Sequence, residues 1–469
     1  MKRTLFFLPV ILIALVCGCT LAPEYTRPDS PVPADWPTGP AYEDARAATD
    51  VPAVQELPWR EFITDTRLQK VIEMAMEGNR DLRLAALNVE KVRALYRIQR
   101  AELFPAVNAA GTRWRERVPA DLSSSGRSMI AEEDSVTLGI TSWEIDFFGR
   151  IRSLEDKALE EYLATEQAHR SARLSLVSAV AGTYLTLAAD RENLKLAMST
   201  LEAQRGAYAL IQRRYEVGLV TELDLRRAQT QVDAARGDVA RYTQMTAQDR
   251  NALDLLAGSA VPEDLLPPDL SSVKPLKDFS PGLSSEVLLN RPDIMAAEHR
   301  LKGAYAFIGA ARAAFLPRVF LTTSVGTASN ELSGLFGAGS ATWNFVPQIT
   351  MPIFDTRVWA ALRVSKAERE IVLAEYEKAI QTAFREVADT LAARGSVDQQ
   401  LSAQRSLVNA IAETYRLSHM RYTKGIDSYL SVLDAQRSLY GATQGLISLN
   451  LAKLVSQVKL YTVMGGGGA

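Results

Sequence analysis

Apolar residues recur at helical spacing along two stretches that contain no proline, residues 120–261 and residues 353–469. Four apolar residues of the first stretch repeat every seven positions, the spacing of a coiled-coil seam: Val180, Leu187, Leu194 and Leu201. A single helix over residues 150–215 would extend for about 100 Å, at about 1.5 Å per residue. A globular core cannot bury a helix of that length. The pattern therefore predicts long helices that pair with others, in the same chain or in further copies.

Alternation of apolar and polar residues predicts two β-hairpins, over residues 106–147 and residues 318–354. In the second hairpin Phe345 and Ile349 fall on one face and Gln348 falls on the other. One face is thus apolar and the other mixed, which is the pattern of a sheet with different surroundings on its two sides.

The chain repeats one unusual stretch. RYEVGLVTELDLRRAQ begins at Arg214, and RYTKGIDSYLSVLDAQ begins 207 positions later, at Arg421. The segment that begins at Asn79 likewise resembles the one that begins at Asn290, so we predict an internal duplication with a period far longer than that of solenoids. The predicted order is a first repeat, a Pro-rich linker, a second repeat and a flexible Gly-rich tail, at residues 61–257, 258–283, 284–464 and 465–469.

Each copy of the repeated stretch is typical of a tight turn between two helices. Gly218 and Gly425 stand where the helix must break, since glycine tolerates the left-handed backbone that ends many helices. Thr221 and Asp224 have the spacing of a capping box, and Asp427 stands where we expect an N-cap. Capping alone explains these residues, so a role in function is a further hypothesis.

The N-terminus has the pattern of a bacterial lipoprotein signal. Two basic residues precede an apolar run that is too short to span a bilayer, and the run ends in Val-Cys-Gly-Cys. A small residue before Cys19 matches the lipobox, so we predict a signal peptide at residues 1–18, a covalent lipid on Cys19 and an extended arm at residues 19–60. Thr20 replaces the Asp that retains lipoproteins at the inner membrane, which favours the outer membrane. An ordinary signal peptide is the alternative.

Composition excludes several classes of function. The formal net charge is −2 and the pI is about 6.1, with acidic and basic residues interleaved, so no basic patch indicates nucleic acid. The three histidines are isolated from one another: His169, His299 and His419. No metal-ligand spacing, phosphate-binding glycine loop or nucleophile motif accompanies them. We predict no enzyme, no metal and no cofactor apart from the lipid on Cys19.

Four predicted strands per chain cannot close a membrane barrel, because open edges are excluded from lipid and even small barrels need about eight strands. Three chains would supply twelve. Several motifs, in this order and spacing, resemble the lipoprotein branch of the TolC family, the OprM- and NodT-like channels: CTLAPEYTRP, SWEIDFFGRIR, RYEVGLVTELDLRRAQ, NRPDI, MPIFDTRV and GIDSYLSVLDAQRSLY.

The resemblance implies a mainly α chain that forms a homotrimer with a twelve-stranded outer-membrane β-barrel, continued by a long periplasmic barrel of helices. It implies a passive exit duct for drugs or other small toxic compounds. Its expected partners are a periplasmic adaptor, an inner-membrane pump of the resistance-nodulation-division class and outer-membrane lipid.

The resemblance also places both repeated turns at a periplasmic entrance that closes by drawing helix ends together. We expect Asp427 to form a threefold ring of carboxylates there, with Asp434 as a second candidate for such a ring. We expect a latch between the two turns in which Asp224 of the first turn bonds to Tyr422, and also to Arg421, of the second. Breaking a buried latch would cost about 1 to 3 kcal/mol, enough to shift a balanced gate.

Two other functions remain open from sequence alone. One is an exit duct for a secreted protein, which the lipobox and the NodT-like motifs argue against. The other is a soluble coiled-coil scaffold lipoprotein of the periplasm with small accessory sheets. A trimer that survives detergent and fractionates with the outer membrane would exclude the scaffold.

Overall fold

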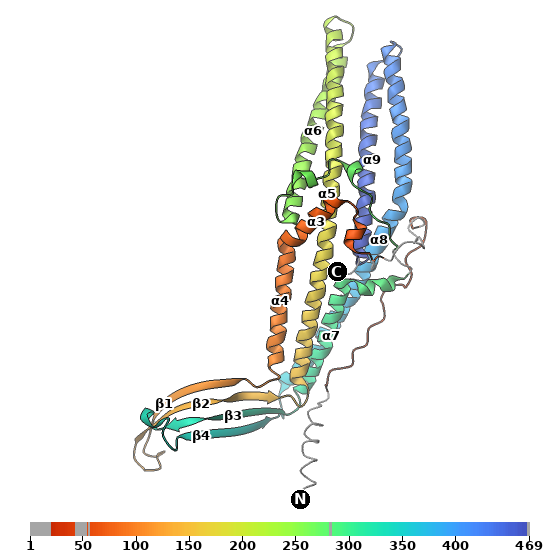
Figure 1. The fold of residues 1–469 in the computed structure, drawn as a ribbon. Helices are drawn as coiled ribbons and strands as arrows, with labels where there is room; N and C mark the ends of the chain where they lie inside the picture. The colour runs from red at the N-terminus through yellow and green to blue at the C-terminus, as the bar shows by residue number, and fades with distance from the viewer. Residues whose placement is uncertain (1–19, 43–53, 55–56, 281–283, 467–469) are drawn as a thin grey trace. The chain divides into compact units, whose positions relative to one another are not determined.

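We describe a computed structural model of the chain, which defines residues 20–42, 54, 57–280 and 284–466. The predicted signal peptide and the predicted lipid on Cys19 lie outside these residues. The α-helices and strands follow in this order: α2 (Trp59–Phe62), α3 (Thr66–Gly78), α4 (Arg80–Ala101), β1 (Val107–Val118), β2 (Met129–Ile145), α5 (Arg150–Glu216), α6 (Glu222–Ala257), α7 (Pro292–Ala313), β3 (Arg318–Ser329), β4 (Ala341–Thr350), α8 (Thr356–Thr423) and α9 (Tyr429–Val463) (Figure 1). Short 3-10 helices occupy four further segments: Glu263–Leu265, Leu270–Ser272, Ser285–Asn290 and Leu332–Gly334.

The chain divides into two compact units. The first, here called the sheet unit, comprises residues 1–29, 88–166 and 296–376. The second, here called the turn unit, comprises residues 30–87, 167–295 and 377–469. Each unit draws on both predicted repeats, so the duplication in sequence does not produce one compact unit per repeat.

The sheet unit contains one antiparallel sheet in the order β1-β2-β3-β4. Each predicted hairpin supplies two neighbouring strands, and the pairing of β2 with β3, which sets Leu138 opposite Val325, joins the two repeats. The register shifts once, between Ile140 and Trp143, where Ser142 has a positive φ of 55°. This bulge lies near the base of β2 and leaves the rest of the ladder regular.

The two faces of the sheet differ in polarity. One face, here called the apolar face, carries Val107, Ala109, Val136, Leu138, Ile140, Val325, Trp343, Phe345 and Ile349. The opposite face, here called the polar face, carries Asn108, Thr112, Ser135, Thr137, Ser324, Asn344 and Gln348. Trp343 and Ile349 are 76% and 71% exposed, so none of the described residues covers this part of the apolar face. Large exposed apolar surfaces mark contact with lipid or with other proteins.

An aromatic cluster joins distant segments of the turn unit. The rings of Phe62 and Tyr461 stack with centroids 4.2 Å apart, and Phe279 packs edge-on against Phe62 at 5.7 Å. The Tyr461 hydroxyl donates to the Leu57 carbonyl at 2.8 Å. The linker that contains Phe279 is therefore anchored by a buried side chain, as aromatic pairs add to the free energy of burial.

The long helix predicted over residues 150–215 is α5, which has 67 residues. Val180 and Leu187 of the predicted seam are fully buried, whereas Met198 of the same helix is 52% exposed. Among the described helices α5 alone is long and apolar enough to cross a membrane, but half of its most apolar segment is buried within the fold. Packing therefore accounts for its apolar residues.

The Gly-rich tail is shorter than predicted. Gly465 and Gly466 are hydrogen-bonded to the end of α9, their amides donating to the carbonyls of Thr462 and Tyr461, each at 3.0 Å. Both glycines have positive φ, which is how glycine closes a helix. The prediction of a loose tail was wrong for these two residues, and the remainder of the tail lies outside the described residues.

The N-terminal arm is tied to α7 within the sheet unit. Arg27 forms two short hydrogen bonds with the buried Glu298 carboxylate, at 2.8 and 3.0 Å, and the Tyr25 hydroxyl donates to the same group at 3.0 Å. Lys302 adds a second positive charge at 3.3 Å. Burial by itself would raise the pKa of the Glu298 carboxyl group. These partners outweigh the burial and hold the pKa of Glu298 below its usual range.

Candidate functional site: the two helical turns

The first repeated turn closes α5 with a Schellman motif. The Leu219 amide donates to the Arg214 carbonyl at 2.8 Å, and the Gly218 amide donates to the Tyr215 carbonyl at 2.9 Å. Gly218 has a φ of 77°, a conformation in which a side chain would be strained. Thr221 then caps α6, and its side chain and that of Asp224 exchange the reciprocal bonds of a capping box, as the sequence predicts.

The second turn repeats this backbone geometry. The Ile426 amide donates to the Arg421 carbonyl and the Gly425 amide donates to the Tyr422 carbonyl, both at 2.9 Å, with Gly425 at a φ of 72°. The repeated Arg-Tyr pair thus supplies the two carbonyls that each motif needs, and the repeated glycine supplies the left-handed residue. This explains the spacing of the residues that recur in the two stretches.

The prediction that Asp427 caps α9 was wrong. The N-cap is Ser428, whose side chain makes no capping bond. The Asp427 carboxylate instead accepts two hydrogen bonds from Arg421, at 2.6 and 3.1 Å, and this pairing holds the pKa of Asp427 below its usual range. A bidentate charge-assisted pair outcompetes a single bond to a backbone amide.

One hydrogen bond links the two turns within the chain. Arg214 Nη1 donates to the Tyr422 hydroxyl at 2.6 Å, and the guanidinium carbon lies 5.7 Å from the centre of that ring. The Tyr422 ring also packs against Tyr429 at 5.1 Å. Among the described residues, no bond of this kind joins Tyr215 to Arg421, so the duplicated turns make an asymmetric contact.

Sequence reasoning missed Arg214 as the partner of Tyr422. The available signal was the repetition itself, because Arg214 is the counterpart of Arg421. Within one chain Asp224 is engaged by Thr221 rather than by Tyr422, and Asp434 pairs with Arg437 on the exposed surface of α9 at 2.9 Å. A latch or a carboxylate ring between chains stays a prediction.

A second cluster, about 40 Å along α5 and α6 from the first turn, was not visible in the sequence. Asp190 of α5 and Asp249 of α6 form a hydrogen-bonded pair in the turn unit, with Asp190 only 6% exposed. Burial, followed by the negative charge of Asp190, raises the pKa of Asp249 to about 7. Burial also raises the pKa of Asp190, opposed by its bonds to Asp249 and Asn193 and by the charge of Arg241. The pair therefore shares a proton near neutral pH.

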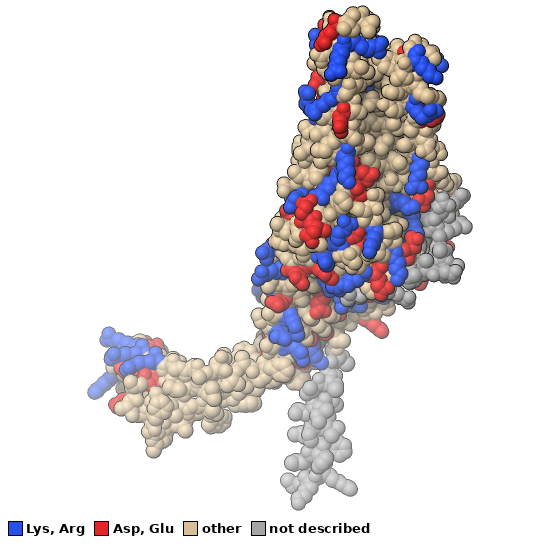
Figure 2. Space-filling view, turned by 45° about the horizontal axis from the view of Figure 1, so that its top comes forward, with Lys and Arg blue, Asp and Glu red and all other residues tan. Residues whose placement is uncertain are grey.

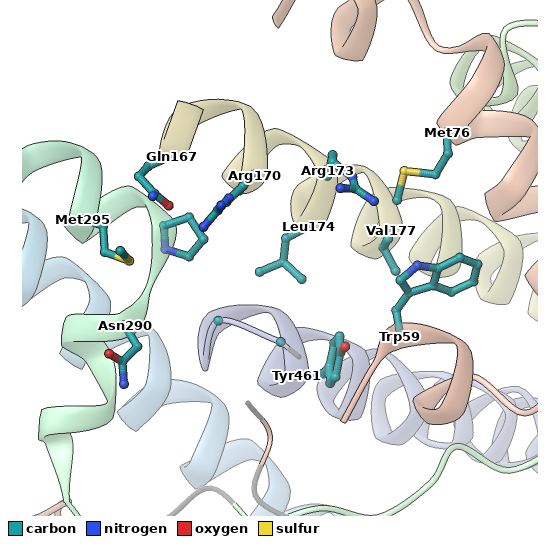
Figure 3. A pocket seen from close by; sticks show the side chains of 13 residues that line it. Trp59, Met76, Gln167, Arg170, Arg173, Leu174, Val177, Asn290, Met295 and Tyr461 are labelled. Carbon is teal, nitrogen blue, oxygen red and sulfur yellow. The ribbon is translucent and has the colours of Figure 1, made fainter. Parts of the chain in front are cut away.

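A pocket of about 330 Å³ lies elsewhere in the turn unit (Figure 3). Its walls are largely apolar, with Trp59, Leu174 and Tyr461 among them, and the side chains of Arg170 and Arg173 extend from α5 beside Leu174. The described residues that line it include no acid, histidine, cysteine or serine. Its lining is therefore that of a largely apolar cavity with two cationic side chains at its wall.

The described residues also contain no cluster of three or more His, Cys, Asp or Glu side chains placed to hold a metal. His299 lies 2.6 Å from the Glu160 carboxylate, and His169 has a pKa lowered by burial and by the charge of Arg173. The residues that stand out are thus the structural and charged groups of the two turns.

The chain combines a sheet whose apolar face is uncovered with long paired helices that end in two matched turns. These features define the class of trimeric outer-membrane channels that continue into the periplasm as helices. The chain belongs to the outer membrane efflux protein family, whose pattern matches residues 71–259 and 283–466. The fold class predicted from the sequence, a mainly α chain that contributes four strands to a trimeric channel, is confirmed. The chain is an efflux exit duct of the outer membrane, as predicted.

Individual relatives cover nearly the whole chain. The antibiotic efflux pump outer membrane protein ArpC of Pseudomonas putida is 48% identical over 451 residues, which are 96% of this chain and 93% of that protein. The outer membrane protein OprJ of Pseudomonas aeruginosa is 43% identical and covers 100% of this chain and 97% of its own length. The open state of the Neisseria gonorrhoeae MtrE channel superimposes with a TM-score of 0.86 at 36% identity, over 96% of this chain and 98% of that one.

Proposed function

We propose that three copies of this chain form the exit duct of a tripartite pump and that the two helical turns are its periplasmic gate. The duct docks with a periplasmic adaptor and an inner-membrane pump of the resistance-nodulation-division class, and the pump supplies the energy. The single observation that carries the gate is the bond between Arg214 and Tyr422, because it ties the end of one helical hairpin to the end of the other.

The magnitude of that bond suits a gate. A hydrogen bond to a charged group contributes about 1.5 to 3 kcal/mol when its loss leaves a partner unpaired. A two-state equilibrium biased by that amount shifts by about ten-fold to a hundred-fold when the bond is removed. Arg421 and Asp427 form a second restraint within the second turn, and in a trimer each of these contacts occurs three times.

The substrates we propose are small, largely apolar toxic compounds. Relatives of this chain carry the names antibiotic efflux pump protein and toluene efflux pump protein. The polar face of the sheet and the helical lumen would contact such cargo weakly, so selectivity lies with the pump. We also propose that Cys19 carries the lipid that holds the arm at the outer membrane, and that the bonds of Arg27 and Tyr25 to Glu298 fix the end of that arm.

Planar-bilayer conductance of the purified trimer tests the gate. Tyr422→Phe removes only the hydroxyl that accepts from Arg214, so we expect a clear rise above a small, mostly closed wild-type conductance. The double variant Asp224→Ala, Asp427→Ala tests the predicted carboxylate contacts in the same assay, and it should raise conductance if those groups also restrain the turns.

Tyr215→Phe is the matched control, because it removes the same hydroxyl at the equivalent position of the first turn. It should leave the conductance at the wild-type value. Equal conductance in wild type, Tyr422→Phe and the double variant would reduce the turns to helix ends without a gating role. No conductance in any of them would argue against an open duct through these turns.

A further inference from the structure

The apolar face of the sheet ends in a band of arginines. On β1 the positions that continue this face toward the β1–β2 loop are Arg113, Arg115 and Arg117, here called the arginine band. Figure 2 shows the sheet largely free of charged side chains, with Lys, Arg, Asp and Glu gathered at one end. The charged groups therefore follow directly on the apolar surface.

Cross-strand partners hold two of these arginines in place. Glu132 stands opposite Arg115 and accepts from its Nε at 2.7 Å, while Asp134 stands opposite Arg113 with its oxygen 3.6 Å from that Nε. Arg117 donates to the Ser128 hydroxyl at 3.2 Å, and within the described residues it forms no ion pair.

The side chains in this band remain available to a ligand. Arg113 and Arg115 are 60% and 64% exposed, and they retain further N–H groups, since a guanidinium has five. The three arginines carry three positive charges, and Glu132 and Asp134 carry two negative charges on the same face. This face therefore has a net charge of one positive unit per chain at this end. Glu116 and Glu133 fall on the polar face, so the charges are sorted by side.

The height of the apolar face locates the band relative to the bilayer. From Ile349 to Ala341 on β4 the face spans eight residues, which is about 27 Å along the strand at about 3.4 Å per residue. At a strand tilt of about 40° this corresponds to a height of about 21 Å, close to the apolar belt of about 25 Å in outer-membrane barrels. Ala341 stands in register with Gly111, through Thr327 and Val136, and Arg113 is the next residue on that face.

The band thus begins where the apolar face ends. Because the helices occupy the periplasm, the strand ends that carry the loops face outward, and the band lies at the headgroups of the outer leaflet. Guanidinium groups pair with phosphate oxygens in a planar, bidentate geometry, and they bind more strongly where water is partly excluded.

We propose that the arginine band is a binding site for the phosphate groups of the anionic glycolipid of the outer leaflet. Glu132 and Asp134 orient two of the guanidinium groups, and Arg117 supplies the unpaired positive charge. The site recurs once per chain around the trimer, on the lipid side of the barrel and separate from the lumen. The proposal depends on the outer-membrane sheet and is independent of the gate.

Purified wild-type trimer in nanodiscs of neutral phospholipid provides the first test. The nanodiscs are doped with bisphosphorylated lipid A or with the same lipid freed of both phosphates, and lipid retained per trimer is measured by native mass spectrometry. We expect retention of the phosphorylated lipid to be greater by about ten-fold and to weaken with salt. Equal retention of the two lipids would overturn the proposal without any variant.

The variant Arg113→Gln, Arg115→Gln, Arg117→Gln should lose that preference. The control Arg226→Gln, Arg236→Gln, Arg416→Gln removes the same charge from comparably exposed arginines of α6 and α8 and should retain it.

Replacement of the band by three lysines keeps the charge and loses the bidentate geometry, so retention should be intermediate. A glutamine variant that assembles as a trimer and retains the phosphorylated lipid as the wild type does would also overturn the proposal. The conductance of the glutamine and lysine variants of the arginine band should equal the wild-type value, which separates failure of this site from failure of the gate.

Discussion

Replacement of Asp249 by Asn should stabilise the protein at pH 8 and leave its stability nearly unchanged below about pH 4. In the folded chain the pKa of Asp249 is about 7, because the carboxyl group is buried beside Asp190. In the unfolded chain the carboxyl group titrates near its ordinary value of 3.8. Between these two values the folded state binds more protons, so its stability falls as the pH rises from about 4 to about 7.

The size of the effect follows from the same two values. A difference of about three pKa units, at about 1.36 kcal/mol each, corresponds to about 4 kcal/mol lost by pH 8. Asn is neutral at every pH and can donate a hydrogen bond to the Asp190 carboxylate, as the protonated Asp249 does. The variant should therefore keep at pH 8 the stability that the wild type has only below about pH 4.

Thermal unfolding of the detergent-solubilised trimer, followed by circular dichroism at 222 nm from pH 5 to pH 8, measures this effect. We expect the unfolding temperature of the wild type to fall across this range by several degrees more than that of Asp249→Asn. Asp233→Asn is the control, since Asp233 is 52% exposed and pairs with Arg236 on the surface of the same helix. Parallel pH profiles for the wild type and Asp249→Asn would refute the shared proton.

Three further predictions concern stability and order. Gly425→Ala should destabilise the second turn by about 1 kcal/mol, because Gly425 has a φ of 72°. Gly441→Ala, within α9, is the control and should be neutral or stabilising. Chemical denaturation measures the free energy of unfolding of both variants. Thr221→Ala should remove the capping box and cost about 1 kcal/mol, and hydrogen exchange at the start of α6 should rise while that at the start of α9 does not. Glu298→Gln should weaken the bonds to Arg27 and speed proteolytic cleavage of the N-terminal arm, and an unchanged cleavage rate would show that the arm is held by other contacts.

The sequence predicted the elements well because their signals are local. The two hairpins, the long helix over residues 150–215 and the two turns follow from periodicity, proline-free stretches and the placement of Gly218 and Gly425. The capping box of Thr221 and Asp224 was also predictable, since its partners lie three residues apart in one turn of helix.

The contacts between elements were less predictable, because they depend on how each helix is rotated and aligned against its neighbour. Asp190 and Asp249 are far apart in the sequence, and nothing in their local surroundings indicates that they meet. From the sequence, Arg421 could pair with Asp224 of the first turn or with Asp427 of its own turn. Only the three-dimensional arrangement shows that it pairs with Asp427. The same limitation hid the bond from Arg214 to Tyr422.

The pairing of β2 with β3 has a consequence for how the channel assembles. Each four-stranded sheet has only two free edges, β1 from the first repeat and β4 from the second. A ring built from separate single-repeat hairpins would need six seams between molecules, whereas the fused chain needs three. Assembly of the ring is therefore third order rather than sixth order in protein concentration, so the presence of both repeats in one chain makes closure far less sensitive to dilution.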